Sequence, residues 1–283
     1  MMILKCDNTW KAKLLTYVGD EYVNCLYLYM DLIKYGLNKA FISVWVDLNS
    51  VGEIKCIVFR YYTGIHIFSK NDKFDMDGVI KIIRKIHPQM INSTRKIIQV
   101  LEPYLDNEYK VDYGCVKSIV HGKFDVFSEV KSARIKDIPA MAVMLCSDEG
   151  IGGSYSIKDM ETQLMARMRD NYTRSYVIYS GEKIVAQAST SAEIDTLAVI
   201  SDVIVDIEYR GRGLAKKLLS VLCNDLIPPK EVFLVCYNPI ADRFYEKFGF
   251  KTRVEWGKLY LKRNNDALSK EMSLIHISEP TRQ

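Results

Sequence analysis

One stretch decides how this chain folds: residues 197–226, LAVISDVIVDIEYRGRGLAKKLLSVLCNDL. Its first part, Val199–Val205, is apolar and β-branched, which predicts a buried strand. In its last part leucine recurs every fourth residue, so one face of a helix is apolar and the other polar. The four positions are Leu214, Leu218, Leu222 and Leu226. The stretch therefore predicts a strand, a turn and an amphipathic helix in direct succession.

The turn between the two elements, Arg210 to Gly213, holds two arginines and two glycines. Unpaired N–H groups in the first turn of a helix converge on an anion, and glycine lets the backbone approach that anion without a Cβ in the way. The arginines add positive charge, so the pattern predicts a pyrophosphate site. The turn matches neither the dinucleotide pattern G-x-G-x-x-G nor the ATP pattern G-x-x-x-x-G-K-[ST], which excludes those two motifs.

The hexamer RGRGLA, Arg210–Ala215, resembles the (Q/R)-x-x-G-x-(G/A) motif with which the GNAT superfamily of N-acetyltransferases binds acetyl-coenzyme A. A second similarity follows the next predicted strand, Glu231–Cys236. There residues 238–250, NPIADRFYEKFGF, resemble the closing motif of the same superfamily, N-x-x-A-x-x-x-Y-x-x-x-G-F, in the usual order and at the usual distance. The chain departs from the family at Ile207, where proline is frequent. A proline would stiffen the turn, and its absence leaves the binding chemistry intact.

The order of elements in the second half agrees with this resemblance. From about residue 129 to 263 the pattern predicts β-α-α-β-β-β-α-β-α-β, which is the GNAT order. The resemblance implies an α/β (α+β) fold with a mixed, mostly antiparallel central sheet flanked by helices. A hairpin of two strands, Tyr176–Tyr179 and Ile184–Ser191, is expected just before the strand that opens the motif.

The first half predicts one helix, three strands, two helices and a strand. Their expected bounds are 20–37, 41–47, 54–62, 65–69, 77–86, 93–105 and 109–120. This order is compatible with a degenerate copy of the same fold, although the half carries neither coenzyme motif. The alternative interpretation is a domain that packs against the second half or shapes its substrate site.

These patterns predict an N-terminal α/β domain at 1–120, a hydrophilic linker at 121–128 and an acetyltransferase domain at 129–265. The last residues, 273–283 (SLIHISEPTRQ), continue no preceding pattern and resemble the read-through translation of a sequencing-library adapter. They are expected to be a non-native tail and are left out of the fold argument.

The composition excludes several classes of protein. The 283 residues suffice for two domains, and 48% hydrophobic with 26% charged residues is typical of a globular protein. No apolar run reaches the ~18 residues of a membrane span. The net charge of +4 is too small to indicate nucleic acid. Seven dispersed cysteines without a C-x-x-C pair suit reduced thiols and argue against a metal site, so we expect a cytoplasmic protein.

The resemblance implies how the donor, acetyl-CoA, is held. The N–H groups of the turn bind its pyrophosphate, and main-chain groups of the preceding strand pair with its pantetheine arm as an added strand would. In the family this strand carries a bulge and splays from its neighbour, which opens the slot. The residues expected to bind the coenzyme are Val203, Val205, Arg210, Gly211, Arg212, Gly213, Leu214, Ala215 and Asn238.

Three residues are candidates for the chemistry of acetyl transfer. Tyr245 of the closing motif can protonate the departing thiolate, because a phenol of pKa ~10 can donate to a thiolate whose conjugate acid has a pKa of ~8.5. Glu193 or Asp202 can deprotonate the amine, directly or through water. In the alternative interpretation Tyr245 is a core aromatic residue, Asp202 a hydrogen-bonded structural group and Glu193 a solvated turn residue.

The predicted function is the acetyl-CoA-dependent N-acetylation of a primary amine by direct attack in a ternary complex. The acceptor is expected to be a small-molecule or peptide amine, selected by the early helices, by the glycine-rich loop at 148–156 and by the first half. The alternative is a catalytically inactive acyl-CoA sensor or interaction protein. RNA binding through Arg-Gly-Arg-Gly is excluded because the pair stands alone within a strand-turn-helix. Monomer and homodimer both remain open.

Overall fold

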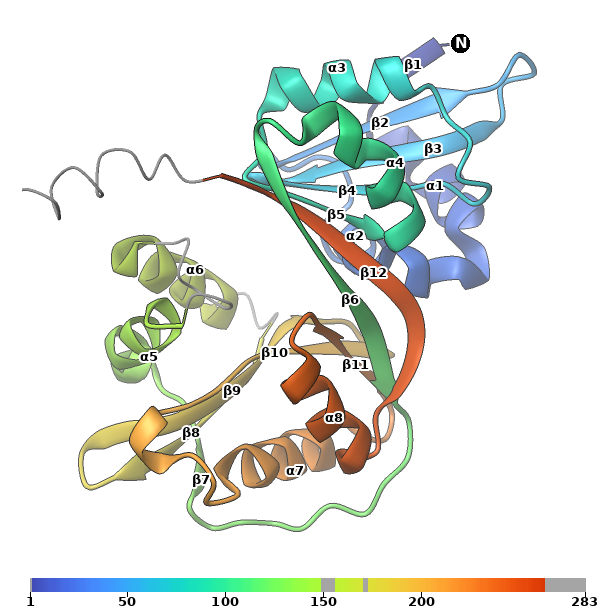
Figure 1. Ribbon diagram of the computed structural model, residues 1–283. Coiled ribbons are helices and arrows are strands. Elements are labelled where there is room, and N and C mark those ends of the chain that lie inside the picture. Colours follow the sequence, from blue (N-terminus) through green and yellow to red (C-terminus); the bar gives the residue numbers. More distant parts are fainter. Residues whose placement is uncertain (1, 149–155, 170–172, 263–283) are drawn as a thin grey trace, which may run out of the picture.

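The computed structural model describes residues 2–148, 156–169 and 173–262. They form one continuous sheet with helices on both faces (Figure 1). The order of its strands is β1-β2-β3-β4-β5-β12-β6-β11-β10-β9-β8-β7. Most of the loop predicted at 148–156, and all of the tail predicted at 273–283, lie outside the described residues. Within the described part of the chain, no helix is long and apolar enough to cross a membrane.

The elements have the following bounds. The strands are β1 Met2–Cys6, β2 Ile42–Leu48, β3 Ile54–Tyr61, β4 Gly64–Phe68, β5 Met90–Thr94, β6 Tyr109–Ile119, β7 Val130–Ser132, β8 Ser175–Ser180, β9 Lys183–Glu193, β10 Leu197–Val205, β11 Glu231–Cys236 and β12 Lys251–Leu261. The helices are α1 Lys11–Val18, α2 Leu26–Tyr35, α3 Met76–Ile86, α4 Arg95–Leu105, α5 Ile138–Cys146, α6 Ile157–Arg169, α7 Leu214–Leu226 and α8 Pro239–Phe248. Short 3-10 segments include η2 Gly19–Cys25 and η4 Ile207–Tyr209.

The predicted mixed sheet flanked by helices is confirmed, with most elements in their expected places. Two boundaries are wrong. The helix expected from Ser93 begins only at Arg95, because Met90–Thr94 forms strand β5, and the helix expected at 20–37 is an α-helix only over Leu26–Tyr35, after the 3-10 segment Gly19–Cys25. Strand β5 pairs with β12, for example Thr94 with Trp256, so its partner lies far away in the sequence. The sequence also failed to predict β1 and α1.

The two halves of the chain exchange strands. Strand β6 of the first half lies between β12 and β11, and β12 of the second half lies between β5 and β6. Figure 1 shows β6 and β12 running side by side as two long strands. They are antiparallel and paired from Tyr109 opposite Leu261 to Ser118 opposite Lys251. Residues 121–128 contain neither helix nor strand, but the sheet continues across this predicted linker, and the domain boundaries stay a prediction.

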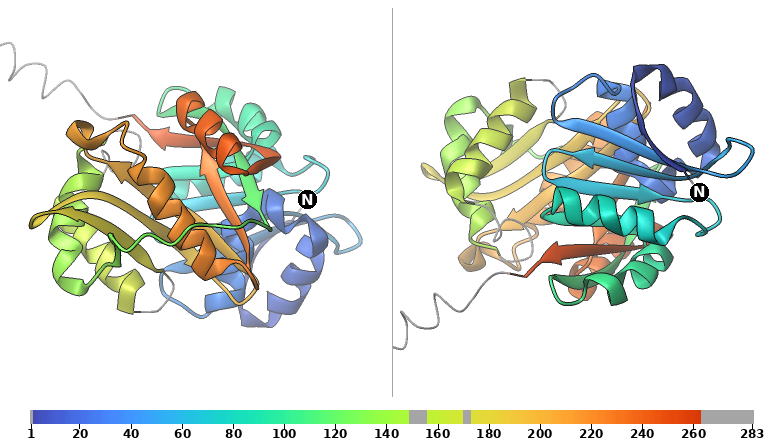
Figure 2. Two further views of the ribbon diagram at one scale, coloured as in Figure 1. Left: turned by 90° about the horizontal axis from the view of Figure 1, so that it is seen from below. Right: turned by 90° about the horizontal axis from the view of Figure 1, so that it is seen from above.

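Helices cover both faces of each half. In the first half α3 and α4 pack on one face, and α1 and α2 pack on the other. In the second half α7 and α8 share one face, and α5 and α6 the other (Figures 1 and 2). Helix α2 extends across the boundary, because its Leu26 and Met30 pack against Val199 of β10 and Phe233 of β11. A helix of the first half therefore covers the strands that carry the predicted motif.

Candidate active site

The strand, turn and helix predicted at 197–226 are present as β10, η4 and α7. Gly211 and Gly213 have φ angles of 77° and 75°, the left-handed region in which glycine avoids a steric penalty. A Cβ placed on either glycine would meet no atom of the described chain within 4 Å. Among the described residues no side chain caps the N-terminus of α7, so the N–H groups of its first turn have neither an intrahelical acceptor nor a side-chain cap. This arrangement suits an anion.

The two arginines of the turn fold back onto it. Arg210 Nε donates to the carbonyl of Val205 at 3.1 Å, and Arg212 Nη2 donates to the carbonyl of Glu208 at 3.0 Å. The Arg212 guanidinium also lies 4.8 Å from the ring centroid of Tyr209. The hydrogen bonds of both arginines therefore stabilise the turn. Their positive charges remain close to the N–H groups at the start of α7.

The first half repeats the strand-helix-strand order in β4, α3 and β5, which include a parallel pair. Its helix, however, begins differently. Asp75 caps α3 by accepting from the N–H of Gly78 at 3.1 Å, and Asp77 lies in the first turn. These carboxylates occupy the helix terminus that an anion would need and repel a pyrophosphate. Of the two corresponding helices, only α7 keeps a free N-terminus.

Strands β10 and β11 separate where the slot is expected. They are parallel neighbours only from Leu197 to Ile200. Beyond Ile200, β10 remains paired with β9 along its other edge, where Val205 lies opposite Ala186. The predicted splay is therefore present, and Val203 and Val205 lie in the segment that has left β11. The carbonyl of Val205 already accepts the bond from Arg210.

A bulge in β10 changes the direction of Asp202. Between Ser201 and Ile204 the strand advances three residues while β9 advances two, so β10 holds one extra residue. As a result Ile200 and Val203 pack on the same face, against α7, whereas Ile204 packs against α5 and α6. Asp202 has a φ of 56°, which is uncommon outside glycine.

The bulge leaves the Asp202 carboxylate within electrostatic range of Arg167 on α6 and of Tyr27 on α2. Burial raises the pKa of Asp202, and the charge of Arg167 partly opposes this rise. Tyr27 comes from the first half and is held by contacts to both halves. Its hydroxyl lies 3.1 Å from Ser191 Oγ of β9, and its ring centroid is 5.7 Å from that of His66.

The second candidate base, Glu193, lies in a different environment. Its carboxylate accepts two hydrogen bonds from Arg174, each of 2.8 Å, and a third of 2.7 Å from the hydroxyl of Thr190. Glu193 is opposite Ala198 in the sheet. Asp202 lies four positions further along the strand than Ala198, which corresponds to about 13 Å at ~3.3 Å per residue. The structure therefore does not bring the two predicted carboxylates together.

Helix α8 carries the last two predicted site residues. Tyr245 packs in the same cluster as Val203 and Val205, with its ring centroid 5.9 Å from that of Phe250. Burial raises the pKa of Tyr245 above its usual value, so the Tyr245 hydroxyl stays protonated at neutral pH. Asn238 caps the helix through Oδ1, which accepts from the N–H groups of Ile240 and Ala241 at 2.8 and 3.3 Å. Its amide Nδ2 is the group left to donate to a ligand.

Tyr27 and Arg167 were not predicted from the sequence as parts of this site. Tyr27 lies in the helix predicted at 20–37, where it was given no role in the site. Arg167 lies on α6, and no motif surrounds it. Both come within electrostatic range of Asp202 only through the fold, since Tyr27 lies 175 positions and Arg167 lies 35 positions before Asp202 in the chain. No local pattern could have indicated either residue.

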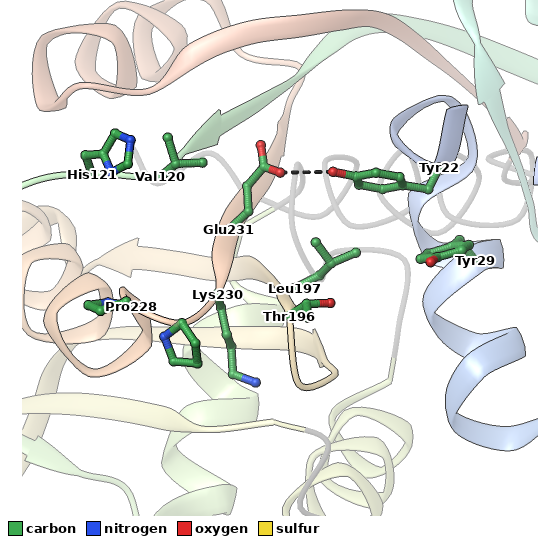
Figure 3. A pocket seen from close by; sticks show the side chains of 10 residues that line it. Tyr22, Tyr29, Val120, His121, Thr196, Leu197, Pro228, Lys230 and Glu231 are labelled. Atoms are coloured by element: carbon green, nitrogen blue, oxygen red, sulfur yellow. Dashed lines mark hydrogen bonds between the residues drawn. The ribbon is translucent and has the colours of Figure 1, made fainter. Parts of the chain in front are cut away.

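A separate hollow of about 490 Å³ lies at the opposite end of β10 and β11 (Figure 3). Tyr22, Leu197 and Glu231 are among its lining residues, and the Tyr22 hydroxyl donates to Glu231 across it at 3.1 Å. Leu197 and Glu231 are the first residues of their strands. In sheets with parallel strands, ligands bind at the carboxyl ends of the strands. The glycine turn and the splay lie at that end of β10 and β11, whereas the hollow lies at the amino end.

Comparison with known proteins agrees with the site. Residues 171–252 match the family described as the acetyltransferase (GNAT) domain. The second half of the chain therefore contains a GNAT acetyltransferase domain. No curated protein matches the sequence significantly.

Solved structures extend the similarity to both halves. A Drosophila protein is 12% identical, with a TM-score of 0.60 over 93% of this chain and 99% of that one. A GCN5-related N-acetyltransferase from Sphaerobacter thermophilus is 13% identical, with a TM-score of 0.58 over 91% and 94%. A tandem GNAT protein from the clavulanic acid biosynthesis pathway is 11% identical, with a TM-score of 0.56 over 91% and 98%. At these identities the comparison shows a common fold.

Proposed function

We propose that this protein is an acetyl-CoA-dependent N-acetyltransferase that transfers the acetyl group to a primary amine in a ternary complex. The observation that carries the proposal is the uncapped N-terminus of α7 behind Gly211 and Gly213, next to the splay between β10 and β11. An anion site beside a free strand edge suits a ligand with a pyrophosphate at one point and an amide-bearing arm beyond it.

In this proposal the donor lies along the turn and the splayed strand. N–H groups from Arg212 to Ala215 bind the pyrophosphate, with Arg210 and Gly211 completing the turn. Main-chain groups of Val203 and Val205 pair with the pantetheine arm, and Asn238 Nδ2 donates to it. The arm would then run toward Tyr245, which shares a cluster with the two valines.

The amine approaches from the face of the sheet covered by α2, α5 and α6, because Asp202 is near Tyr27 and Arg167 there. Asp202 accepts a proton from the ammonium, directly or through water, and a raised pKa makes this carboxylate a stronger base. The free amine then attacks the thioester carbonyl carbon. The tetrahedral intermediate collapses to the amide as its C–S bond breaks, and Tyr245 gives its proton to the departing thiolate. The second proton that the attacking nitrogen must lose passes to the Tyr245 phenolate or to water, and the proton held by Asp202 leaves to solvent.

The test is a screen in which release of free CoA from acetyl-CoA is followed by chromatography. The full chain is supplied with small primary amines, amino acids, polyamines and lysine-containing peptides. An acceptor-dependent release of CoA, with a matching N-acetylated product, is the expected result. Release that never exceeds the amine-free rate, in a protein that binds acetyl-CoA, would instead favour the inactive sensor.

The variant Tyr245→Phe sharpens this test. It keeps the ring that packs against Phe250 and removes only the hydroxyl. We expect turnover to fall by roughly 10²-fold or more, the usual effect of losing a positioned acid, with acetyl-CoA binding retained. An unchanged turnover number would eliminate Tyr245 as the acid.

A further inference from the structure

Strand β6 of the first half carries a lysine that is buried beneath helix α8. The Lys117 side chain is 0% exposed. Its Nζ lies 2.9 Å from Asp242 Oδ1 and 3.0 Å from Glu246 Oε1, both on α8, and 2.9 Å from Thr252 Oγ1 on β12. One ammonium from the first half thus joins the predicted catalytic helix to the centre of the sheet.

The arrangement restricts the position of α8. A buried ammonium is costly unless charged and polar partners surround it, so the contacts of Lys117 are held strongly. Asp242 and Glu246 are one helical turn apart and therefore lie on the same side of α8. If the helix rotated or slid, Nζ would lose at least one of its two carboxylates.

The protonation of Lys117 is consistent with this role. Burial alone would lower the pKa of Lys117, but its hydrogen bonds to Asp242 and Glu246 outweigh burial and raise the pKa. The ammonium is therefore charged at neutral pH. Its two carboxylate partners remain partly exposed, at 31% and 54%, so α8 covers the charge from the solvent side.

Two further residues of β6, Cys115 and Gly114, lie close to the first turn of α8 and to the segment just before it. Cys115 Sγ donates to Asp242 Oδ1 at 3.3 Å. Gly114 lies so close to β11 that an added Cβ would be 2.1 Å from the carbonyl oxygen of Cys236 and 2.8 Å from the Tyr237 ring. Only glycine fits at that position, directly before the turn that leads to Asn238.

We propose that Lys117 is a positioning residue: through it, the first half of the chain fixes helix α8 and with it Tyr245 and Asn238. Tyr245 lies between Asp242 and Glu246 in sequence, and Asn238 is one turn before Asp242. Among the described residues of the second half none occupies this point of the sheet, because β6 lies between β11 and β12. The catalytic consequence rests on the proposed function, whereas the fixing of α8 does not.

The variant Lys117→Met tests this role. It keeps the length and the apolar stem of the side chain and removes the ammonium. The matched control is Lys55→Met on β3, which breaks a pair of 3.1 Å between Lys55 and the buried Asp47, far from α8. Lys117→Arg, which keeps the charge and the donors, serves as the rescue variant.

Two measurements follow on the full chain. Hydrogen exchange by mass spectrometry should show faster exchange in peptides covering 239–248 of Lys117→Met, and unchanged exchange in 214–226. With the acceptor found in the screen, kcat should fall roughly 10- to 100-fold, the scale of an ångström-sized misplacement. The Kd for acetyl-CoA should rise much less than kcat falls, because the glycine turn is untouched and only the contact from Asn238 is loosened. Lys117→Arg should recover part of kcat, and Lys55→Met should keep kcat.

The two measurements separate the outcomes. Unchanged exchange in 239–248 would overturn the proposal whatever the activity. A kcat lost equally in Lys117→Met and Lys55→Met would reduce Lys117 to a general contributor to stability, and would also overturn it. If the wild-type chain acetylates no amine, the proposed function fails, but faster exchange confined to 239–248 would still support Lys117 as the residue that fixes α8.

Discussion

Replacing Asp202 by asparagine should make the protein more stable and less active at the same time. Asp202 lies in the bulge of β10 at a φ of 56°, where asparagine is tolerated better than most residues. The pKa of this carboxyl is raised by burial. The folded state therefore binds this proton more tightly than the unfolded state does. Stability is lost as the pH rises from the pKa of the unfolded state, about 3.9, to the pKa of the folded state. Asparagine cannot ionise and avoids this loss.

The magnitudes follow from the same argument. Each unit by which folding raises a pKa costs about 1.4 kcal/mol once the group is ionised. In domains of roughly 150 to 250 residues, each kcal/mol moves Tm by about 2 to 4 °C. Asp202→Asn should therefore raise Tm at pH 8, and the gain should vanish below pH ~3.9. Turnover should fall by about 10²- to 10⁴-fold, as for loss of a general base.

The assay is thermal unfolding followed by circular dichroism from pH 3 to 8, together with the CoA-release rate. Asp206→Asn is the matched control, only four residues away. The pKa of Asp206 is lowered by its hydrogen bond to Lys183, at 2.7 Å. Its stabilising effect is present at neutral pH and is lost as the pH falls through the folded value, so this substitution should change stability in the opposite direction.

The results that refute the reasoning are equally definite. If Asp202→Asn were less stable than the wild type at pH 8, the carboxylate would be a favourable structural group. If it were more stable but fully active, Asp202 would not be the base.

Three further predictions concern the core, the second carboxylate and the exchanged strand. Trp256 is 1% exposed and packs against α2. Trp256→Ala should lower the free energy of unfolding by about 3 to 5 kcal/mol, as measured by urea denaturation. A loss below 1 kcal/mol would contradict the place of Trp256 in the core. Glu193→Gln weakens the bidentate contact to Arg174 and should lower Tm while kcat stays near the wild-type value, whereas a large loss of kcat would restore Glu193 as a candidate base. A fragment of residues 129–262 lacks β6, the strand between β11 and β12. This fragment should therefore show no cooperative thermal transition. A stable, cooperative fragment would show instead that the predicted domain folds alone.

The parts of the site that the sequence predicted are those formed by neighbours in the chain. The glycine turn, helix α7 and the helix that carries Tyr245 all depend on residues that are close to each other in the chain. The pattern of apolar residues also predicts most strands, because this pattern can be recognised in each strand without knowledge of its partner. The splay was expected only from the family resemblance.

The parts that could not be predicted depend on pairings between distant residues. Strand β5 was not predicted, and its last two residues, Ser93 and Thr94, were taken as the start of a helix, because its partner β12 lies more than 150 residues later. The bulge in β10 was expected only from the family resemblance, and its position, which decides the face that Asp202 occupies, follows neither from the alternation of apolar residues nor from the motif. Lys117 would be expected on the surface, since lysine is almost never fully buried without partners. Its partners on α8 lie 125 and 129 positions further along the chain.

The most direct test of the central claim is a calorimetric titration of acetyl-CoA into the full chain and into two variants. Gly213→Glu places a carboxylate in front of α7, and Gly52→Glu makes the same change at a glycine of the first half that also has a positive φ and open space around it. We predict that the wild type and Gly52→Glu bind acetyl-CoA alike, and that Gly213→Glu does not bind it. Equal binding by all three proteins, or none by the folded wild type, would contradict the assignment of this turn as the pyrophosphate site.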